Sequence, residues 1–290
     1  MPSASANGIT IEYETTGDPA EPALLLVMGL GAQLIHWPDE FCAALAGRGF
    51  FVVRYDNRDV GLSTKTDGPV PDLLAALQGD TSQATYTLVD MAGDGIALLD
   101  ALGVGAAHVV GVSMGGMIAQ NLAIHHPDRV LSLCSIMSTP NGNMSSDPAS
   151  PEAGAMLFRP PAKSRDEAVA QSVEGARVIG SPAFAVNEDE IRARAAQAYD
   201  RCFYPLGTSR QLCAIVASGD WRPGLAELDV PTLVIHGSAD PLVRPSWGRA
   251  TAEAIPGAEL LMIEGMGHDL PRGVWDTLVE AIVANITKAS

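Results

Sequence analysis

Apolar runs of strand length alternate with helix-like segments along this chain, and this alternation constrains the fold more than any other feature. The strand-like runs cover residues 23–28, 50–55, 108–112, 130–137, 232–236 and 260–263. Apolar residues three or four positions apart mark helical segments at 39–48, 88–102, 114–125 and 274–287. The alternation predicts an α/β fold whose mostly parallel central sheet is flanked by helices on both faces. Residues 10–14 alternate apolar and polar side chains, which favours an antiparallel edge strand.

The alternation stops between residues 140 and 224. Pro, Gly, Ser and Asn cluster first in this stretch, and helical segments follow without a convincing strand. Ser164 precedes Glu167 by three residues, and Asn187 precedes Glu190 in the same way, which is typical of helix N-termini. We therefore expect a core formed by residues 1–139 and 225–290, with a helical cap inserted at 140–224. An ordinary run of surface helices is the alternative.

Size and charge limit the classes of protein to consider. The chain has 290 residues, 47% of them hydrophobic, which suffices for a large α/β domain with an extensive core. A formal net charge of −16 disfavours binding to nucleic-acid phosphates or to anionic membranes. The expected partner is a small molecule, and the sequence leaves a homo-oligomer open.

Neither targeting nor metal chemistry is indicated by the sequence. Residues 1–10 lack a basic segment followed by an apolar stretch, and no long apolar run follows, so we expect a cytoplasmic protein without membrane insertion. Whether a leader peptide was removed is left open. Cys42, Cys134, Cys202 and Cys213 are scattered without a C-x-x-C spacing, so we expect no metal site.

The pattern G-x-S-x-G at residues 111–115 is the strongest functional signal. The run before it is rich in valine and of strand length, and a helix-like segment begins at Met114. A serine on such a sharp strand-to-helix turn projects its hydroxyl out of the fold, while glycine on both flanks relieves crowding. Ser113 is therefore the expected nucleophile.

A serine hydroxyl needs a neighbouring base to act as a nucleophile at neutral pH. His268 is the expected base, because Gly265 and Gly267 flank a loop that follows the last predicted strand. The histidines with plausible structural roles in strands or at element ends are His108, His125, His126 and His236.

A carboxylate is expected to orient that base, and Asp240 is the best candidate. It lies just beyond the strand at 232–236, where α/β sheets gather their functional groups. Asp220 and Asp229 are weaker rivals because neither directly follows a strand. The resulting chain order, Ser then Asp then His, is that of α/β hydrolases rather than of chymotrypsin or subtilisin.

Attack on an ester carbonyl creates an oxyanion, which preorganised backbone N–H groups can stabilise. The first expected donor is the N–H of Met114, directly after the nucleophile. The second is expected in the glycine-rich loop after residues 23–28, where Leu30 is the preferred donor and Gly31 the alternative.

Residues 111–115, the strand end before Asp240 and residues 265–268 together resemble the α/β-hydrolase fold superfamily over nearly the whole chain. Residues 22–29, 37–41 and 54–59 are further similar to aclacinomycin methylesterase-like bacterial carboxylesterases. The resemblance implies a Ser113, Asp240 and His268 triad that hydrolyses polyketide methyl esters. The serine mechanism itself requires neither a cofactor nor a metal.

Two positions depart from the wider superfamily. Met28 stands where many members carry histidine, and Asp59 replaces a glycine that is usual in its turn. The methylesterase-like branch is similar to this chain at both positions, so we interpret them as marks of that branch.

The substrate is expected to be a small to medium hydrophobic ester or a natural-product methyl ester, cleaved through an acyl-enzyme. The expected pocket residues are Gly29, His36, Trp37, Met156, Phe158, Phe203 and Trp221. Aromatic and apolar residues in the cap could equally form its own core. Carbon–carbon bond hydrolysis and perhydrolysis use similar elbows, and a small-molecule receptor with little turnover is the alternative from another class.

Overall fold

An eight-stranded sheet forms the centre of the molecule, with the strand order β1-β2-β4-β3-β5-β6-β7-β8. The computed structural model describes residues 2–289. Its strands are β1 (Ser3–Ala6), β2 (Ile9–Thr16), β3 (Ala23–Val27), β4 (Phe51–Tyr55), β5 (Ala107–Val112), β6 (Val130–Ile136), β7 (Thr232–Gly237) and β8 (Glu259–Ile263). The strands from β4 through β8 pair in parallel, which confirms the predicted α/β fold.

The antiparallel part of the sheet differs from the expectation in one respect. Strand β2 is antiparallel to β4, as predicted for residues 10–14, but it is not the edge. Strand β1 pairs outside it, also antiparallel. The short segment Ser3–Ala6 carries only small residues, so no apolar alternation marks it in the sequence, and its pairing with β2 holds it in place.

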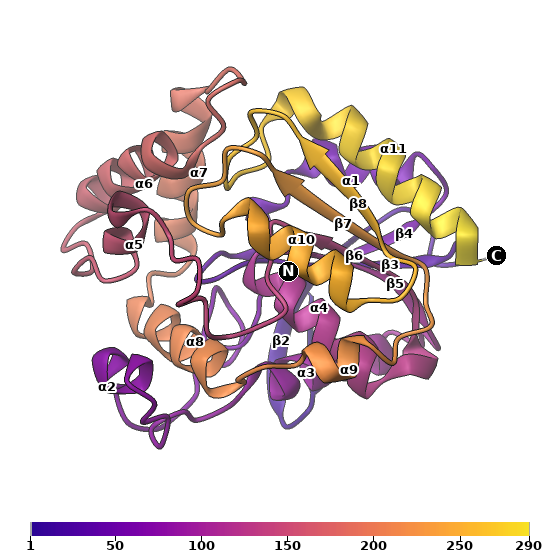
Figure 1. Ribbon diagram of the computed structural model, residues 1–290, viewed down its shortest axis with the longest axis horizontal. Helices are drawn as coiled ribbons and strands as arrows, with labels where there is room; N and C mark the ends of the chain where they lie inside the picture. Colours follow the sequence, from indigo (N-terminus) through magenta and orange to yellow (C-terminus); the bar gives the residue numbers. More distant parts are fainter. Residues whose placement is uncertain (1, 290) are drawn as a thin grey trace.

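Helices cover both faces of the sheet (Figure 1). Helices α1 (Asp39–Ala46) and α11 (Trp275–Ile286) pack on one face. Helices α3 (Leu88–Ala101) and α4 (Met114–His125) pack on the other, as does the C-terminal end of α10 (Pro245–Ala254). The sequence analysis did not predict α10, although the proline at its first position is typical of a helix start.

Burial on both faces of the sheet explains why the sequence of β3 is continuously apolar. In β3, Leu24 and Leu26 pack into the core under α1 and α11, whereas Leu25 and Val27 pack into the core under α3 and α4. Alternate side chains of a strand point to opposite faces, so a sheet covered on both sides buries every position. All five residues of β3 are accordingly buried.

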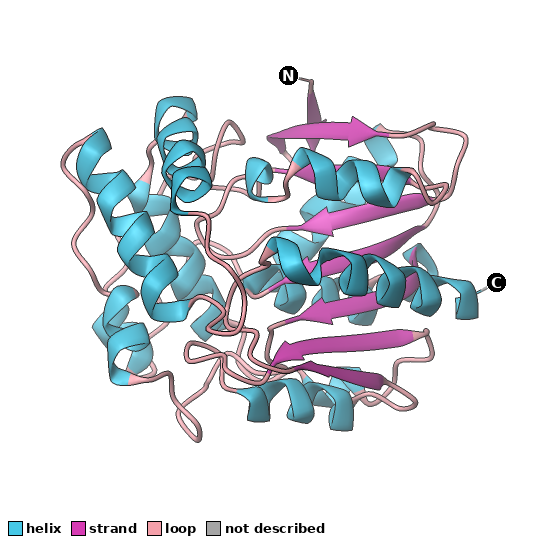
Figure 2. Cartoon of the chain, turned by 90° about the horizontal axis from the view of Figure 1, so that it is seen from above, coloured by secondary structure: helices cyan, strands magenta, loops and turns pink. Residues whose placement is uncertain are grey.

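A helical region is inserted between β6 and β7. It contains α5 (Pro151–Met156), α6 (Arg165–Ile179), α7 (Glu188–Arg201), α8 (Pro205–Ala217) and α9 (Arg222–Leu225). Figure 2 shows most of these helices gathered beyond the end of the sheet toward which the parallel strands point. We call α5 to α8 with their connections the cap, and the boundaries at residues 140 and 224 remain a prediction.

The predicted starts of two cap helices are where the structure places them. The Ser164 hydroxyl accepts a hydrogen bond from the N–H of Glu167, and α6 begins directly after Ser164, at Arg165. The Asn187 side chain accepts from the N–H of Glu190, and α7 begins likewise. Each cap satisfies an N–H group that lacks a partner within the helix.

Asp59 lies in the turn after β4 and adopts a φ of 67°, a left-handed conformation that favours glycine. Its carboxylate accepts the N–H of Thr66 at 2.7 Å and the hydroxyl of Tyr86 at 2.8 Å. Aspartate tolerates this region better than most residues do, and these two hydrogen bonds further offset the backbone strain. The replacement of the usual glycine is therefore accommodated by the local structure. A short helix, α2 (Leu73–Leu77), follows this turn.

Candidate active site

Ser113 occupies the junction between β5 and α4 with a φ of 56° and a ψ of −122°. Its N–H donates to the Ile136 carbonyl at 2.9 Å, which ties the turn to β6. A Cβ atom added at Gly111 would lie 2.1 Å from the Gly115 carbonyl oxygen, and one at Gly115 would lie 2.1 Å from the Val27 oxygen. The glycines of G-x-S-x-G are therefore required by close backbone approach.

The structure brings Ser113, His268 and Asp240 together from three separate loops. His268 Nε2 lies 2.9 Å from Ser113 Oγ, and His268 Nδ1 lies 2.7 Å from Asp240 Oδ2. Because a carboxylate can only accept, Nδ1 carries the imidazole proton and Nε2 is free to accept from the serine. Such a line of hydrogen bonds can transfer the serine proton to the imidazole during nucleophilic attack.

Asp240 is buried and fully hydrogen-bonded. Its Oδ1 accepts the N–H groups of Leu242 and Val243, both at 2.9 Å, which leaves Oδ2 for His268. His236 Nε2 lies 3.6 Å from Oδ2 and 2.8 Å from the Val243 carbonyl, to which it donates. Burial lowers the pKa of His236, which keeps this second imidazole neutral.

The loop that carries His268 is held by the cap. The N–H of His268 donates to the Ile179 carbonyl at 2.6 Å, and the N–H of Gly267 donates to Ser181 Oγ at 2.8 Å. Ser181 in turn donates to Asp269, whose pKa burial raises. The end of α6 and the residues after it therefore fix the position of the imidazole, a role that the sequence analysis did not find.

Two backbone N–H groups near Ser113 are unused within residues 2–289. The loop after β3 passes close to the serine, because a Cβ added at Gly29 would lie 3.2 Å from Ser113 Cβ. The N–H groups of Leu30 and Met114 donate no hydrogen bond to another described residue. The N–H of Gly31, by contrast, donates to Gln211 Oε1 at 2.8 Å. Of the two donors considered for this loop, only Leu30 is left free.

Two expected pocket residues from the core lie in the short 3-10 helix η1 (Leu34–His36) and directly after it. His36 Nδ1 lies 3.1 Å from the Gln33 carbonyl, and burial lowers the pKa of His36 to about 4. Trp37 is fully buried and stacks on Phe41 with ring centroids 5.7 Å apart. Its Nε1 has no hydrogen-bond partner among the described residues.

The expected pocket residues outside the core occupy different environments. Met156 ends α5 and is half-buried, whereas Phe158 and Phe203 expose 51% and 41% of their surface. Trp221 is buried against the core helices, and its Nε1 donates to Gln120 Oε1 at 2.7 Å. Core packing accounts fully for the burial of Trp221.

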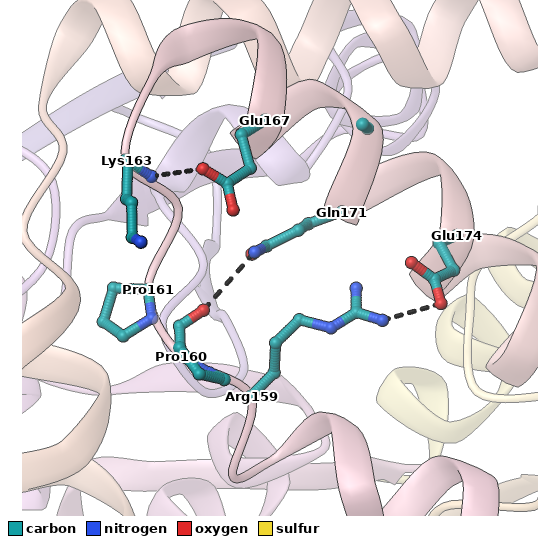
Figure 3. A pocket seen from close by; sticks show the side chains of 8 residues that line it. Arg159, Pro160, Pro161, Lys163, Glu167, Gln171 and Glu174 are labelled. Carbon is teal, nitrogen blue, oxygen red and sulfur yellow. Dashed lines mark hydrogen bonds and ion pairs between the residues drawn. The ribbon is translucent and has the colours of Figure 1, made fainter.

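A separate cleft of about 480 Å³ lies on the cap, between α6 and the segment before it (Figure 3). Arg159 pairs with Glu174 at 2.7 Å, and Gln171 donates to the Pro160 carbonyl at 3.3 Å. None of its lining residues is a serine, cysteine or histidine. Within residues 2–289, no three His, Cys, Asp or Glu side chains gather as a metal site.

The hydrogen-bonded residues Ser113, His268 and Asp240 lie at the carboxyl ends of parallel strands in an α/β sheet, and the comparison with protein families identifies this fold. The model of the alpha/beta hydrolase fold matches residues 22–271. The chain belongs to the α/β-hydrolase fold family. The matched residues include Ser113, Asp240 and His268 as well as the inserted cap.

Individual relatives within this family are ester hydrolases. A rhodomycin D methylesterase of a Streptomyces strain is 33% identical over 97% of this chain and 96% of its own length. A 3-oxoadipate enol-lactonase of Acinetobacter baylyi is 28% identical over 90% of this chain and 87% of its own length. The crystal structure of the enol-lactonase from Burkholderia xenovorans superimposes with a TM-score of 0.77 at 25% identity, covering 99% of this chain and all of that one. No helix within residues 2–289 is long and apolar enough to cross a membrane.

Proposed function

We propose that this α/β hydrolase cleaves carboxylic esters with Ser113 as nucleophile, His268 as general base and Asp240 as the orienting carboxylate. One observation carries the proposal: the continuous line from Ser113 Oγ through His268 to a buried Asp240, with contacts of 2.9 Å and 2.7 Å. A pure binding protein has no need for this order of nucleophile, base and orienting group.

The reaction follows from these positions. Ser113 Oγ attacks the ester carbonyl carbon while His268 Nε2 takes the hydroxyl proton. The carbonyl oxygen becomes an oxyanion, which the N–H groups of Leu30 and Met114 would hold. His268 then protonates the leaving alcohol, and an acyl-Ser113 ester remains. Water, deprotonated by His268, attacks this ester and releases the carboxylic acid and the free serine.

The proposed substrates are esters with a hydrophobic acyl part, methyl esters in particular. The methylesterase relative at 33% identity over nearly the full length supports this class. His36 and the exposed aromatic side chains of Phe158 and Phe203 are proposed as pocket residues. Enol lactones are cyclic esters that the same steps would open, and the 28% identical enol-lactonase makes them the second candidate.

The test is hydrolysis of p-nitrophenyl esters of increasing acyl length, followed by methyl esters and an enol lactone, with the wild-type protein and Ser113→Ala. A serine-reactive phosphonate and intact-mass measurement complete the experiment. We expect one label on the wild type, none on Ser113→Ala and turnover only with the wild type. Turnover by folded Ser113→Ala would show that Ser113 is not the nucleophile. A labelled serine without ester turnover would favour carbon–carbon hydrolysis, perhydrolysis or a receptor.

A further inference from the structure

Gln211 is a polar residue that is fully buried between the cap and the core. It lies on cap helix α8 and is fully buried, next to the buried residues Leu212 and Cys213. Burying an amide is unfavourable unless both of its ends are hydrogen-bonded. An aliphatic side chain of similar size would pack there without that requirement. The partners of the amide oxygen and nitrogen therefore indicate why a glutamine is present.

Both ends of the Gln211 amide bind the backbone of the core. Its Oε1 accepts the N–H of Gly31 at 2.8 Å, and its Nε2 donates to the Arg58 carbonyl at 2.8 Å. The partners fix the orientation of the amide, because a backbone N–H only donates and a carbonyl only accepts. The side chain therefore bridges the loop after β3 to the turn after β4.

The loop that Gln211 binds is the one proposed to supply the second oxyanion donor. It lies between the nucleophile and the cap: Gly29 approaches Ser113 Cβ on one side, and Gly31 approaches Thr208 of α8 on the other. A Cβ at Gly31 would lie 2.6 Å from Thr208 Oγ1, and Gly31 has a φ of 66°. From the core side, Asn57 Nδ2 donates to the Met28 carbonyl at 2.9 Å.

We propose that Gln211 is a positioning residue for ester hydrolysis. It holds the N–H of Gly31 and thereby orients the N–H of the preceding residue, Leu30, toward the oxyanion. This inference rests on the proposed function. The hydrogen bond turns the Gly31 N–H toward the cap, whereas the Leu30 N–H donates to no other described residue. Oxyanion donors act through preorganisation, so a loop free to rotate stabilises the transition state less.

The proposal makes the cap part of the catalytic machinery, although Gln211 does not touch the substrate. Gln211→Met removes both hydrogen bonds and preserves the length of the side chain. Gln211→Glu keeps the acceptor for Gly31 but loses the amide donor to Arg58. Gln120→Met is the matched control, because Gln120 is also a fully buried glutamine, bonded to Ser135 and Trp221 rather than to the oxyanion loop.

The experiment measures kcat and KM on a p-nitrophenyl ester, normalised to the sites that a phosphonate titrates, together with the inhibition constant of a trifluoromethyl ketone. This ketone forms a tetrahedral adduct with the serine and places an oxyanion in the same site. For Gln211→Met we expect kcat to fall by about 10- to 100-fold with KM changed less than about threefold. The ketone should weaken by a similar factor, and Gln211→Glu should lie between Gln211→Met and the wild type.

The opposite outcomes are distinct. If Gln211→Met and Gln120→Met have wild-type kcat per titrated site and bind the ketone equally well, Gln211 is a structural residue and the inference is overturned. Fewer titrated sites with unchanged kcat per site would likewise indicate loss of folding alone. Failure of the proposed function would instead appear in the wild type, as absence of turnover and of labelling.

Discussion

Asp240 and His268 are joined through a single carboxylate oxygen, Oδ2, which lies 2.7 Å from the imidazole Nδ1. The other oxygen, Oδ1, is bound by the N–H groups of Leu242 and Val243. The two backbone donors therefore fix the rotation of the carboxylate, and the remaining oxygen selects the imidazole tautomer that leaves Nε2 facing Ser113.

Asp240→Asn should lose nearly all activity while the protein stays folded. The asparagine Oδ1 can keep both backbone bonds, which places its NH₂ group toward Nδ1 of His268. The imidazole then adopts the other tautomer and Nε2 cannot accept the serine proton, so we expect kcat to fall about 10⁴-fold. Ester kinetics and circular dichroism would check this. Activity within tenfold of the wild type would show that Asp240 does not orient the base.

Ser113→Gly should be inactive yet more stable than Ser113→Ala. Ser113 holds a positive φ of 56°, a conformation that costs a residue with a Cβ atom about 1–3 kcal/mol. Glycine relieves this strain at an entropic cost of about 0.5–1 kcal/mol, so we expect a net gain of about 1 kcal/mol. Urea denaturation of the two variants measures the difference. Equal free energies of unfolding would show that the elbow is not strained.

Gly115→Ala should destabilise the fold, and Gly105→Ala is its matched control. The added Cβ would lie 2.1 Å from the Val27 carbonyl oxygen, which must move together with the start of α4. Overpacking of this kind costs about 1–3 kcal/mol or more. At Gly105 the Cβ meets nothing within 4 Å and the backbone conformation is ordinary, so little change is expected. Thermal denaturation of both variants tests the difference, and equal melting temperatures would contradict the close approach.

Ser181→Ala should weaken the connection between the cap and the catalytic loop. It removes the acceptor for the Gly267 N–H and the donor to Asp269, so a buried N–H is left unsatisfied at a cost of about 1–3 kcal/mol. We expect a lower melting temperature and a lower kcat, since the adjacent His268 is less well held. Ser172→Ala is the control, because its exposed hydroxyl bonds only within α6. Similar effects of both substitutions would show that Ser181 does not hold the catalytic loop.

Stability should fall as the pH drops from about 6.5 to about 4, and His36 should contribute to this fall. Burial lowers the pKa of His36 in the folded protein to about 4, below its ordinary value of 6.5. The unfolded chain then binds the proton first, so the stabilisation is present above the unfolded pKa and is lost toward the folded pKa. Its size is on the order of 3 kcal/mol.

Urea denaturation at pH 7.5 and 4.5 would measure this contribution by comparing the wild type with His36→Asn. We expect the pH-dependent loss of stability to be smaller in the variant, because asparagine does not titrate. Some loss should persist, since burial also lowers the pKa of His108 and His236. An identical pH dependence in both proteins would show that His36 is protonated equally in the folded and unfolded states.

Local sequence patterns predict much of the fold. The strand Ala23–Val27 is buried on both faces and is apolar at every position, and the capping residues Ser164 and Asn187 mark helix starts through bonds three residues away. The elbow is local as well, because the steric demands of its tight turn require glycine at 111 and 115. Strand β1 has a weak local pattern, and its pairing with β2 stabilises it.

The sequence by itself determined the α/β alternation, the inserted helical region and the residue types at three strand ends, because each depends on neighbours a few positions apart. Only the tertiary structure decided which groups meet. Gln211 reaches Gly31 across 180 positions and Ser181 reaches Gly267 across 86, and no periodicity records such contacts. The physical reason is that hydrogen bonds between distant segments depend on how the cap packs over the sheet. That packing is a property of the whole chain.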